Sequence, residues 1–218
     1  MTKIFRIGAF LLLLTATVSA QTNNDAYTKT LTARSTKIAE KLSITDSASF
    51  HQVVAILVNQ YKSLGKIYDS RDAAIKTAKE KAENDKAGFQ ATEQALMDNA
   101  DAQLYNLHCA FIGALSGDLS PKQIDEVKDG MTYRVLEVTY GAYLAMIPNL
   151  KTNEKRQIYS WLAEAREHAI DAQSAGKKHA WFNKFKGRIN NYLSKQGYNM
   201  QQERVAWAKR IKESQHKK

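Results

Sequence analysis

The sequence predicts an all-α fold, a single multi-helix bundle or helical array of about eight helices with no sheet. Apolar residues recur at spacings of three and four along most of the chain, and no segment alternates apolar and polar residues as a half-buried strand would. Helix-breaking residues are sparse, with 2 prolines and 10 glycines in 218 residues. No repeat of fixed period and no long linker is found, so residues 21–218 are expected to form one domain.

In the first half of the chain, the apolar spacing predicts four helical segments. Ser47 or Ser49 is expected to cap the second of them. The third segment is rich in charge and alanine and has only a thin apolar stripe, which is typical of a long arm or one limb of a hairpin. In chain order the four segments are Tyr27–Leu42, Phe50–Leu64, Asp69–Lys86 and Met97–Leu115.

In the second half, turn and capping residues mark the helix ends. Ser120 and Pro121 are expected to open one helix, because serine caps and proline suits the first helical position. Pro148 is expected to close another. The predicted helices are Pro121–Gly130, Tyr133–Met146, Asn153–Ala172 with Thr152 or Asn153 as its cap, Trp181–Gln196 ending before Gly197, and a last helix capped by Asn199, with a frayed tail at 214–218.

Residues 1–20 have the three parts of a secretory signal peptide. These are the basic residues Lys3 and Arg6, the apolar run Ile7–Leu14, and the small-residue pattern Val18-Ser19-Ala20. The mature chain is therefore expected to begin at Gln21; the alternative is an uncleaved N-terminal anchor. No cysteine lies at the cleavage site, so the pattern does not predict a lipoprotein. We expect an exported protein, periplasmic or extracellular.

Later segments give no membrane span, because the most apolar stretch, residues 133–148, is interrupted by Arg134 and Glu137. The single cysteine, Cys109, falls on an apolar helical stripe with Leu104 and Phe111. We expect it to be a packed, inert thiol, since buried structural cysteines stay neutral.

Charge is concentrated at the C-terminal end. The net charge is +10, and residues 177–218 hold twelve Lys or Arg against Glu203 and Glu213. Such a surface favours an anionic partner: nucleic acid, an acidic membrane surface or an acidic polysaccharide. Because export is expected, nucleic acid is the least expected of these three partners. The alternative is a solvated basic tail that keeps the protein soluble.

One helix flank carries groups that could transfer protons. Glu164, His168 and Asp171 follow one another at i, i+4 and i+7, so they lie on one side of the predicted helix. They are the candidate catalytic residues, and ordinary salt-linked surface decoration is the alternative. A helical metal site usually needs ligands from a second helix, and His51, His108 and His179 qualify only by residue type, so neither a metal nor a cofactor is predicted. No recognised catalytic motif occurs.

Residues 177–198 combine aromatic, amide and cationic side chains. Rings that stack on the C–H face of a sugar, beside forked donors for its hydroxyls, are typical of saccharide sites. The alternative is that Trp181 anchors the core and the asparagines cap helices. The candidate ligand-binding residues are Trp181, His179, Arg166, Arg188, Asn190 and Asn191. Their role requires the indole, imidazole and guanidinium groups to face a common hollow.

Four strings carry a resemblance to a known family. They are KDGMTY at 128–133, VTYGAYLAMIPNL at 138–150, WLAEAREHAIDA at 161–172 and KHAWFNKFKGRINNYLSKQGY at 178–198. Together they resemble the exported bacterial family named domain of unknown function 3826, for which sugar binding is conjectured. The resemblance is close over residues 119–211 and implies a polysaccharide-utilisation setting, but no catalytic residues.

Three functions are therefore open. The leading one is an exported accessory protein that binds an oligo- or polysaccharide, with an acidic glycan favoured by the basic C-terminal region. The others are a glycan-active enzyme that uses the flank with Glu164, and a helical scaffold that docks a protein partner. The oligomeric state is not predicted.

Overall fold

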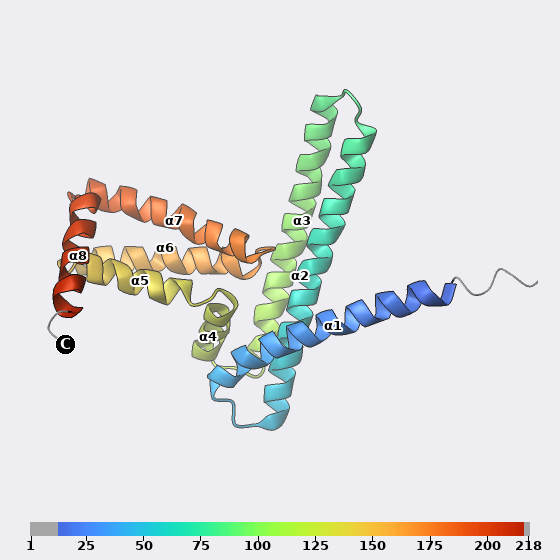
Figure 1. Cartoon of the computed structure of the whole chain (residues 1–218), viewed down its shortest axis with the longest axis horizontal. Coiled ribbons are helices and arrows are strands. Elements are labelled where there is room, and N and C mark those ends of the chain that lie inside the picture. Colours follow the sequence, from blue (N-terminus) through green and yellow to red (C-terminus); the bar gives the residue numbers. More distant parts are fainter. Residues whose placement is uncertain (1–12, 216–218) are drawn as a thin grey trace, which may run out of the picture. The chain divides into compact units, whose positions relative to one another are not determined.

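The computed structural model describes residues 13–215, with side chains from residue 25 onward, and Figure 1 shows its helices in chain order. The described part consists of helices and their connections, without a strand, which confirms the all-α prediction. The elements are α1 (Leu13–Ala39), the short 3₁₀ helix η1 (Glu40–Leu42), α2 (Ser47–Lys81), α3 (Lys86–Leu115), α4 (Pro121–Met131), α5 (Val135–Met146), α6 (Thr152–Ile170), α7 (Ala175–Lys195) and α8 (Met200–Gln215).

The chain separates into two compact units, residues 1–61 and residues 62–218. Helix α2 runs without interruption from the first unit into the second, and the single domain expected for residues 21–218 stays a prediction. Most of the expected signal peptide lies outside the described residues, so its cleavage also stays a prediction. Of the expected frayed tail, Ser214 and Gln215 belong to α8 and the last three residues lie outside the described part.

The long helix α2 replaces two helices that the sequence led us to expect. The segments Phe50–Leu64 and Asp69–Lys86 are joined in one helix, which ends at Lys81. No proline lies within it to interrupt the hydrogen-bond ladder. Asp46, rather than a serine, serves its first turn, since its carboxylate accepts the backbone N–H of Ser49 at 2.7 Å. The expected hairpin limb is present, because α3 follows after a four-residue connection.

Several predicted helix ends are confirmed. Ser120 caps α4 in a capping box with Gln123, and Pro121 occupies the first turn. Gly197 follows α7 with a φ of 97°, a left-handed conformation that glycine adopts without strain. The side chain of Asn199 accepts the backbone N–H of Gln202 at 3.1 Å at the start of α8.

Other predicted helix starts are wrong: α3 begins eleven residues, α6 one residue and α7 six residues earlier than expected. Helix α6 is not capped by Thr152 or Asn153; instead Glu154 reaches back and accepts the backbone N–H of Lys151 at 2.8 Å. Helix α7 begins at Ala175, where a loop was expected, because Ser174 caps it by accepting the N–H of Lys177. Ser174 therefore starts α7 earlier than the aromatic residues from Trp181 onward predict.

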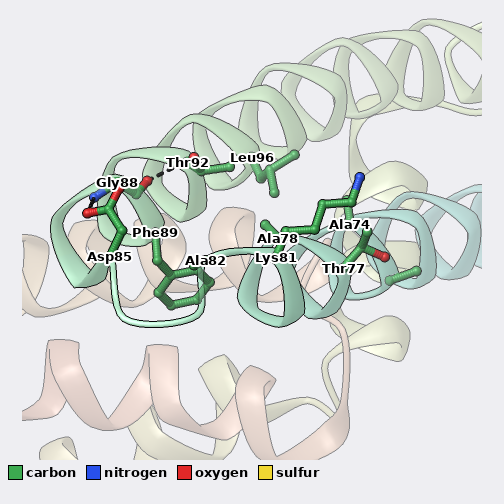
Figure 2. Close-up of a pocket in the computed structure, with 11 residues that line it drawn as sticks. Ala74, Thr77, Ala78, Lys81, Ala82, Asp85, Gly88, Phe89, Thr92 and Leu96 are labelled. Atoms are coloured by element: carbon green, nitrogen blue, oxygen red, sulfur yellow. Dashed lines mark hydrogen bonds between the residues drawn. The ribbon is translucent and has the colours of Figure 1, made fainter.

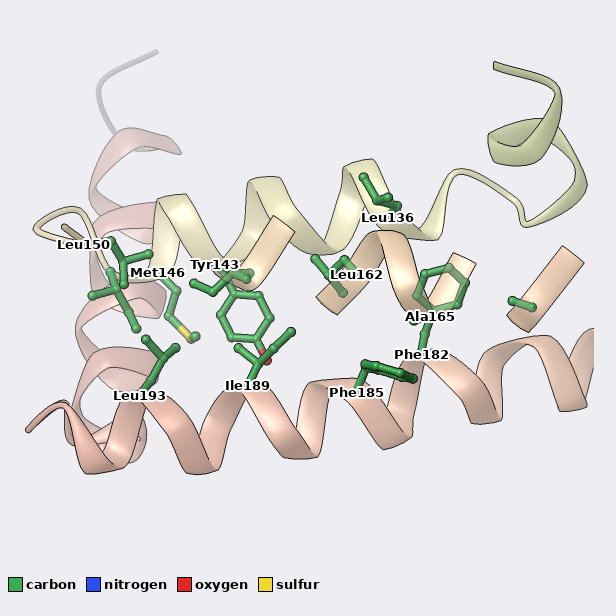
Figure 3. Packing of buried hydrophobic residues seen from close by; sticks show 13 residues of the cluster. Leu136, Tyr143, Met146, Leu150, Leu162, Ala165, Phe182, Phe185, Ile189 and Leu193 are labelled. Carbon is green, nitrogen blue, oxygen red and sulfur yellow. The ribbon is translucent and has the colours of Figure 1, made fainter. Parts of the chain in front are cut away.

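The core of the second unit lies among α5, α6 and α7. Figure 3 shows side chains from these helices pointing toward one another, with Leu162 of α6, Phe182 of α7 and Tyr143 of α5 among them. Leu162 is fully buried and Phe182 nearly so. Helix α8 is tied to the end of α5 by Arg210, whose guanidinium donates to the carbonyl oxygens of Ala145 and Met146. The buried residues of α6 and α7 belong to one apolar cluster, and this packing holds the two helices in a fixed register.

A buried lysine sets the turn between α6 and α7. The ammonium group of Lys178 donates to the carbonyl oxygens of Ala169 and Ile170, at 2.9 and 2.8 Å. These carbonyls belong to the last turn of α6, where the regular i+4 donors of the helix are missing; the carbonyl of Ala169 also accepts the backbone N–H of Ala172 at 3.2 Å. A cation there also interacts favourably with the helix dipole. The Lys178 side chain thus anchors the first turn of α7 to the last turn of α6.

The prediction for Cys109 is wrong, because the residue is exposed. Only part of the expected apolar stripe of α3 is buried: Phe111 and Leu115 are in the core, whereas Leu104 is half-buried. Cys109 points away from that strip. Within the described residues, no helix combines the length and the apolar character that crossing a bilayer would require.

The anchoring role of Lys178 gives a test. Replacing Lys178 by Met keeps the length of the side chain but leaves two buried carbonyl oxygens without their charged donor. The unfolding free energy should fall by about 1–3 kcal/mol, the usual cost of losing hydrogen bonds to a buried charged donor. Urea denaturation followed by tryptophan fluorescence measures it, since all three tryptophans lie in the second unit.

The neighbouring exposed lysine is the matched control. Lys177→Met removes the same charge one residue away from an exposed side chain, and should change the unfolding free energy by less than about 0.5 kcal/mol. Equal effects of the two substitutions would contradict the assignment.

Candidate functional site

A hollow of about 710 Å³ opens in the second unit beside the end of α6. We call it the His168 hollow. Its volume falls in the range of small-molecule sites, and four helices, α2, α3, α6 and α7, contribute side chains to it. Its lining residues are Tyr68, Arg71, Asp72, Ile75, Met97, Asp101, Leu104, Tyr105, His108, Glu167, His168, Asp171, Ala172, Gln173, Lys177 and Trp181.

Aromatic rings form one part of this lining. The rings of His168 and Trp181 stack with centroids 4.3 Å apart and an interplanar angle of 14°. The stack follows from the α6–α7 turn, which places the half-buried Trp181 of α7 beside the last turns of α6. The ammonium of Lys184 lies over the same indole, 4.9 Å from the ring centroid. Tyr105 of α3 is 70% exposed, so its ring is open to a ligand.

Opposite charges meet at the base of the hollow. Nδ1 of His108 lies 2.7 Å from a carboxylate oxygen of Asp171, and the hydroxyl of Tyr68 donates to the backbone carbonyl of Asp171 at 2.7 Å. Burial raises the pKa of Tyr68 to about 12, with Arg71 opposing and Asp171 adding to the shift. The tyrosine therefore keeps its proton and remains a donor. These contacts bind α2 and α3 to the end of α6.

A second carboxylate lies on the other side of the imidazole. Nε2 of His108 is 3.8 Å from Glu167, whose carboxylate also pairs with Lys128 of α4 at 2.8 Å. The hydrogen bond to Asp171 raises the pKa of His108; burial opposes this, and the negative charges of Asp171 and Glu167 reinforce it. The cationic form of His108 is thus favoured between two carboxylates.

A network of side-chain hydrogen bonds borders the hollow on the α2 side. Arg71 donates to the carboxylate of Asp72 and, at 3.1 Å, to the side-chain oxygen of Gln173. The amide nitrogen of Gln173 in turn donates to Asp72 at 2.9 Å. The guanidinium of Arg71 also lies over the ring of Tyr68. Donors and acceptors are therefore held in place by one another.

The arrangement can perform two kinds of chemistry. Open rings beside fixed carboxylate, amide and guanidinium groups can hold a polyhydroxylated ring. The pair of His108 and Asp171 can also exchange a proton with a bound group. In the described part of the chain, no three His, Cys, Asp or Glu side chains are grouped so that they could hold a metal ion.

The structure brings together only some of the residues selected from the sequence. His168, Asp171 and Trp181 share the His168 hollow. Arg188 and Asn191 instead line a separate hollow on α7. The guanidinium of Arg188 therefore does not face the same hollow as the indole and imidazole groups.

Four other candidates lie outside the His168 hollow. Glu164 is exposed and 3.6 Å from Arg188. Arg166 is buried and pairs with Asp125 and Asp129 of α4, at 2.5 and 2.9 Å, so it joins α4 to α6. The remaining two make local contacts: His179 stacks on Tyr133, and Asn190 accepts the hydroxyl hydrogen of Tyr143 at 2.8 Å.

Sequence reasoning missed three members of the site. Tyr105 lies in a predicted helix, but its exposure has no signal in the apolar pattern. His108 was named only by type, although it is the histidine that meets Asp171. Glu167 follows Arg166 in the chain and is in reach of His108 only because α3 and α6 come together. Nothing short of the tertiary contact identifies these residues as partners.

A further groove lies at the tip of the α2–α3 hairpin, around Phe89 (Figure 2). Alanines from α2 line much of it. Its charged lining residues are Lys81 and Asp85, and Asp85 is engaged in accepting the backbone N–H of Gly88 at 2.9 Å. Because polar groups do not converge on it, this groove is the weaker candidate.

The pKa of His108 predicts a pH dependence. A histidine whose pKa is raised on folding stabilises the fold fully below its ordinary value of about 6.5, and this contribution is lost as the pH rises through the raised value. His108→Gln should therefore destabilise the protein more at about pH 6 than at about pH 9, by about 1 kcal/mol. Urea unfolding at both pH values measures this.

The control is the exposed His51, which lies in the first unit. His51→Gln should change the unfolding free energy by less than about 0.5 kcal/mol, because it replaces an exposed surface side chain. If the destabilisation by His108→Gln instead grew as the pH rises, it would contradict the charged contact between His108 and Asp171.

A known family model covers most of the chain. The model of a family described as protein of unknown function (DUF3826) matches residues 28–213, so the chain belongs to this family. The match extends well beyond residues 119–211, where the resemblance of the sequence strings is close. No curated protein is significantly similar to the chain.

Proposed function

We propose that this member of the family is an exported protein that binds an oligo- or polysaccharide in the His168 hollow. The observation that carries the proposal is the composition of this hollow: open aromatic rings lie beside polar groups that are already fixed by one another. The family itself has no assigned activity, so the proposal rests on the chemistry of these side chains. Export rests on the residues of the expected signal peptide.

The aromatic part of the hollow suits a pyranose ring. Tyr105 presents most of its surface, and the stacked imidazole and indole form a second ring surface. Sugars present C–H faces that pack against aromatic rings, and a water-exposed ring gains most from such contact. Because Lys184 lies over Trp181, a sugar would contact the exposed His168 ring and Tyr105 first.

The polar part of the hollow suits hydroxyl groups. The side chains of Arg71, Asp72 and Gln173 hold one another by hydrogen bonds, and such preorganisation lowers the ordering cost of binding. Acidic lining residues, Asp101 and Glu167 among them, outnumber the cationic Arg71 and Lys177. The His168 hollow is thus not strongly cationic, and a neutral saccharide unit fits its charge.

A second candidate is a glycan-active enzyme. The contact between His108 and Asp171 at 2.7 Å favours it, because an imidazole oriented by a carboxylate can act as a general acid or base. Here the proton-transfer pair differs from the flank expected from the sequence, since Glu164 lies elsewhere.

Tyr105 provides the direct test of saccharide binding. The protein should be retained on at least one member of a panel of neutral and acidic polysaccharides, at low and moderate salt. Tyr105→Ala should weaken that binding about tenfold, equivalent to about 1.4 kcal/mol, because it removes an open stacking surface. Titration calorimetry with the matching oligosaccharide measures the affinity.

Tyr159 is the matched control, since it is an exposed tyrosine that packs against Tyr140 and lines no described hollow. Tyr159→Ala should leave binding unchanged. Absence of retention on every polysaccharide would overturn the proposal. Shortening of the oligosaccharide during titration, lost in His108→Gln, would favour the enzyme instead.

A further inference from the structure

A second hollow, of about 570 Å³, lies on the exposed side of α6 and α7. We call it the Trp161 hollow. All of its lining residues but one come from α7, at positions three to four residues apart. They are Trp161, Lys184, Gly187, Arg188, Asn191, Tyr192 and Lys195.

The charge of this hollow differs from that of the His168 hollow. Lys184, Arg188 and Lys195 are cationic, and the lining includes no carboxylate. The nearest described acidic partner is Glu164, 3.6 Å from Arg188, and both of these side chains are about half exposed, at 48% and 54%. Ion pairs of this kind are weak in water, so an incoming anion can compete for the guanidinium.

The guanidinium is held in position by an aromatic ring. The Cζ atom of Arg188 lies over the indole of Trp161, 4.5 Å from the centroid. Tyr192 supports this indole from the side, with ring centroids 5.3 Å apart and an interplanar angle of 88°. A stacked guanidinium keeps its edge donors free to bind an oxyanion in a forked geometry.

A glycine keeps the floor of the hollow open. Gly187 lies in the interior of α7, where glycine weakens a helix. A Cβ atom at this position would meet no described atom within 4 Å, so packing does not require the glycine. The missing side chain of Gly187 leaves space between Lys184, one turn before it, and Asn191, one turn after it.

We propose that the Trp161 hollow binds the anionic substituent, a carboxylate or a sulfate ester, of an acidic saccharide. Arg188 binds the oxyanion, Lys184 and Lys195 add attraction, and the amide of Asn191 pairs with a neighbouring hydroxyl. The saccharide nature of the ligand rests on the proposed function, whereas its negative charge rests on this hollow alone. The protein then has one hollow for neutral sugar rings and another for acidic groups.

The experiment follows the indole N–H signals of the full chain by ¹⁵N NMR. Trp161→Phe and Trp181→Phe assign the signals of the two hollows. The probes are trigalacturonate, a chondroitin sulfate hexasaccharide and neutral cellotriose. An acidic probe should shift the Trp161 signal, and cellotriose should not. Arg188→Gln should weaken binding of the acidic probe about tenfold. Added salt should weaken this binding further.

Lys209 supplies the charge-matched control, because it is 78% exposed on α8 and lines neither hollow. Lys209→Gln should leave the affinity unchanged. The two acidic probes distinguish carboxylate from sulfate: the one that shifts the Trp161 signal at lower concentration identifies the preferred group.

Other outcomes separate this inference from the proposed function. Saccharides that shift Trp181 but never Trp161 would overturn the inference and leave saccharide binding in the His168 hollow intact. An acidic shift at Trp161 alone would support the inference and count against the His168 hollow. Tighter Arg188-dependent binding of a thymidine oligonucleotide, or of vesicles rich in phosphatidylglycerol, would overturn the assignment to a saccharide.

Discussion

The arrangement of both hollows depends on the contact between the Lys178 ammonium and the last carbonyl oxygens of α6. This contact turns the chain back after α6 and places the first turn of α7 against the same helix end. Trp181, three residues later, comes to lie on His168 as a result. Phe182 and Phe185, one and four residues after Trp181, enter the core, which directs Lys184 and Arg188 outward. A buried lysine therefore settles which face of α7 is available to a ligand.

The two hollows divide the chemistry expected of a single site. The His168 hollow draws on four helices and pairs several of its charged groups with one another, whereas the Trp161 hollow is almost wholly a feature of α7 and is cationic. Ions paired within a site are costly to separate, so such a network recognises neutral hydroxyls better than it recognises an anion. An unbalanced surface attracts anions over a longer range. The basic character of residues 177–218 thus has a local counterpart in the face that carries Arg188.

Buried polar contacts also explain why the site is rigid. Arg166 pairs with two carboxylates of α4, and Lys128 of the same helix pairs with Glu167. Glu167 then meets His108 of α3. The positions of α3, α4 and α6 are thereby coupled through charge, so protonation of His108 affects the attachment of the helical hairpin to the rest of the second unit. Polar groups that are mutually satisfied in this way specify a geometry as well as contributing stability.

The sequence by itself determined the all-α class, several helix ends and the chemical character of residues 177–198, because helical periodicity, capping residues and composition act locally. It failed where local signals compete. Helix α2 was divided in two since its apolar stripe thins out beyond Leu64, and Cys109 was placed inside because a residue's position on a stripe does not reveal how far its neighbours cover it. The tertiary structure alone decided which groups meet. His108 is separated from Asp171 by 63 residues, and only packing between helices can bring such groups within a hydrogen bond of one another.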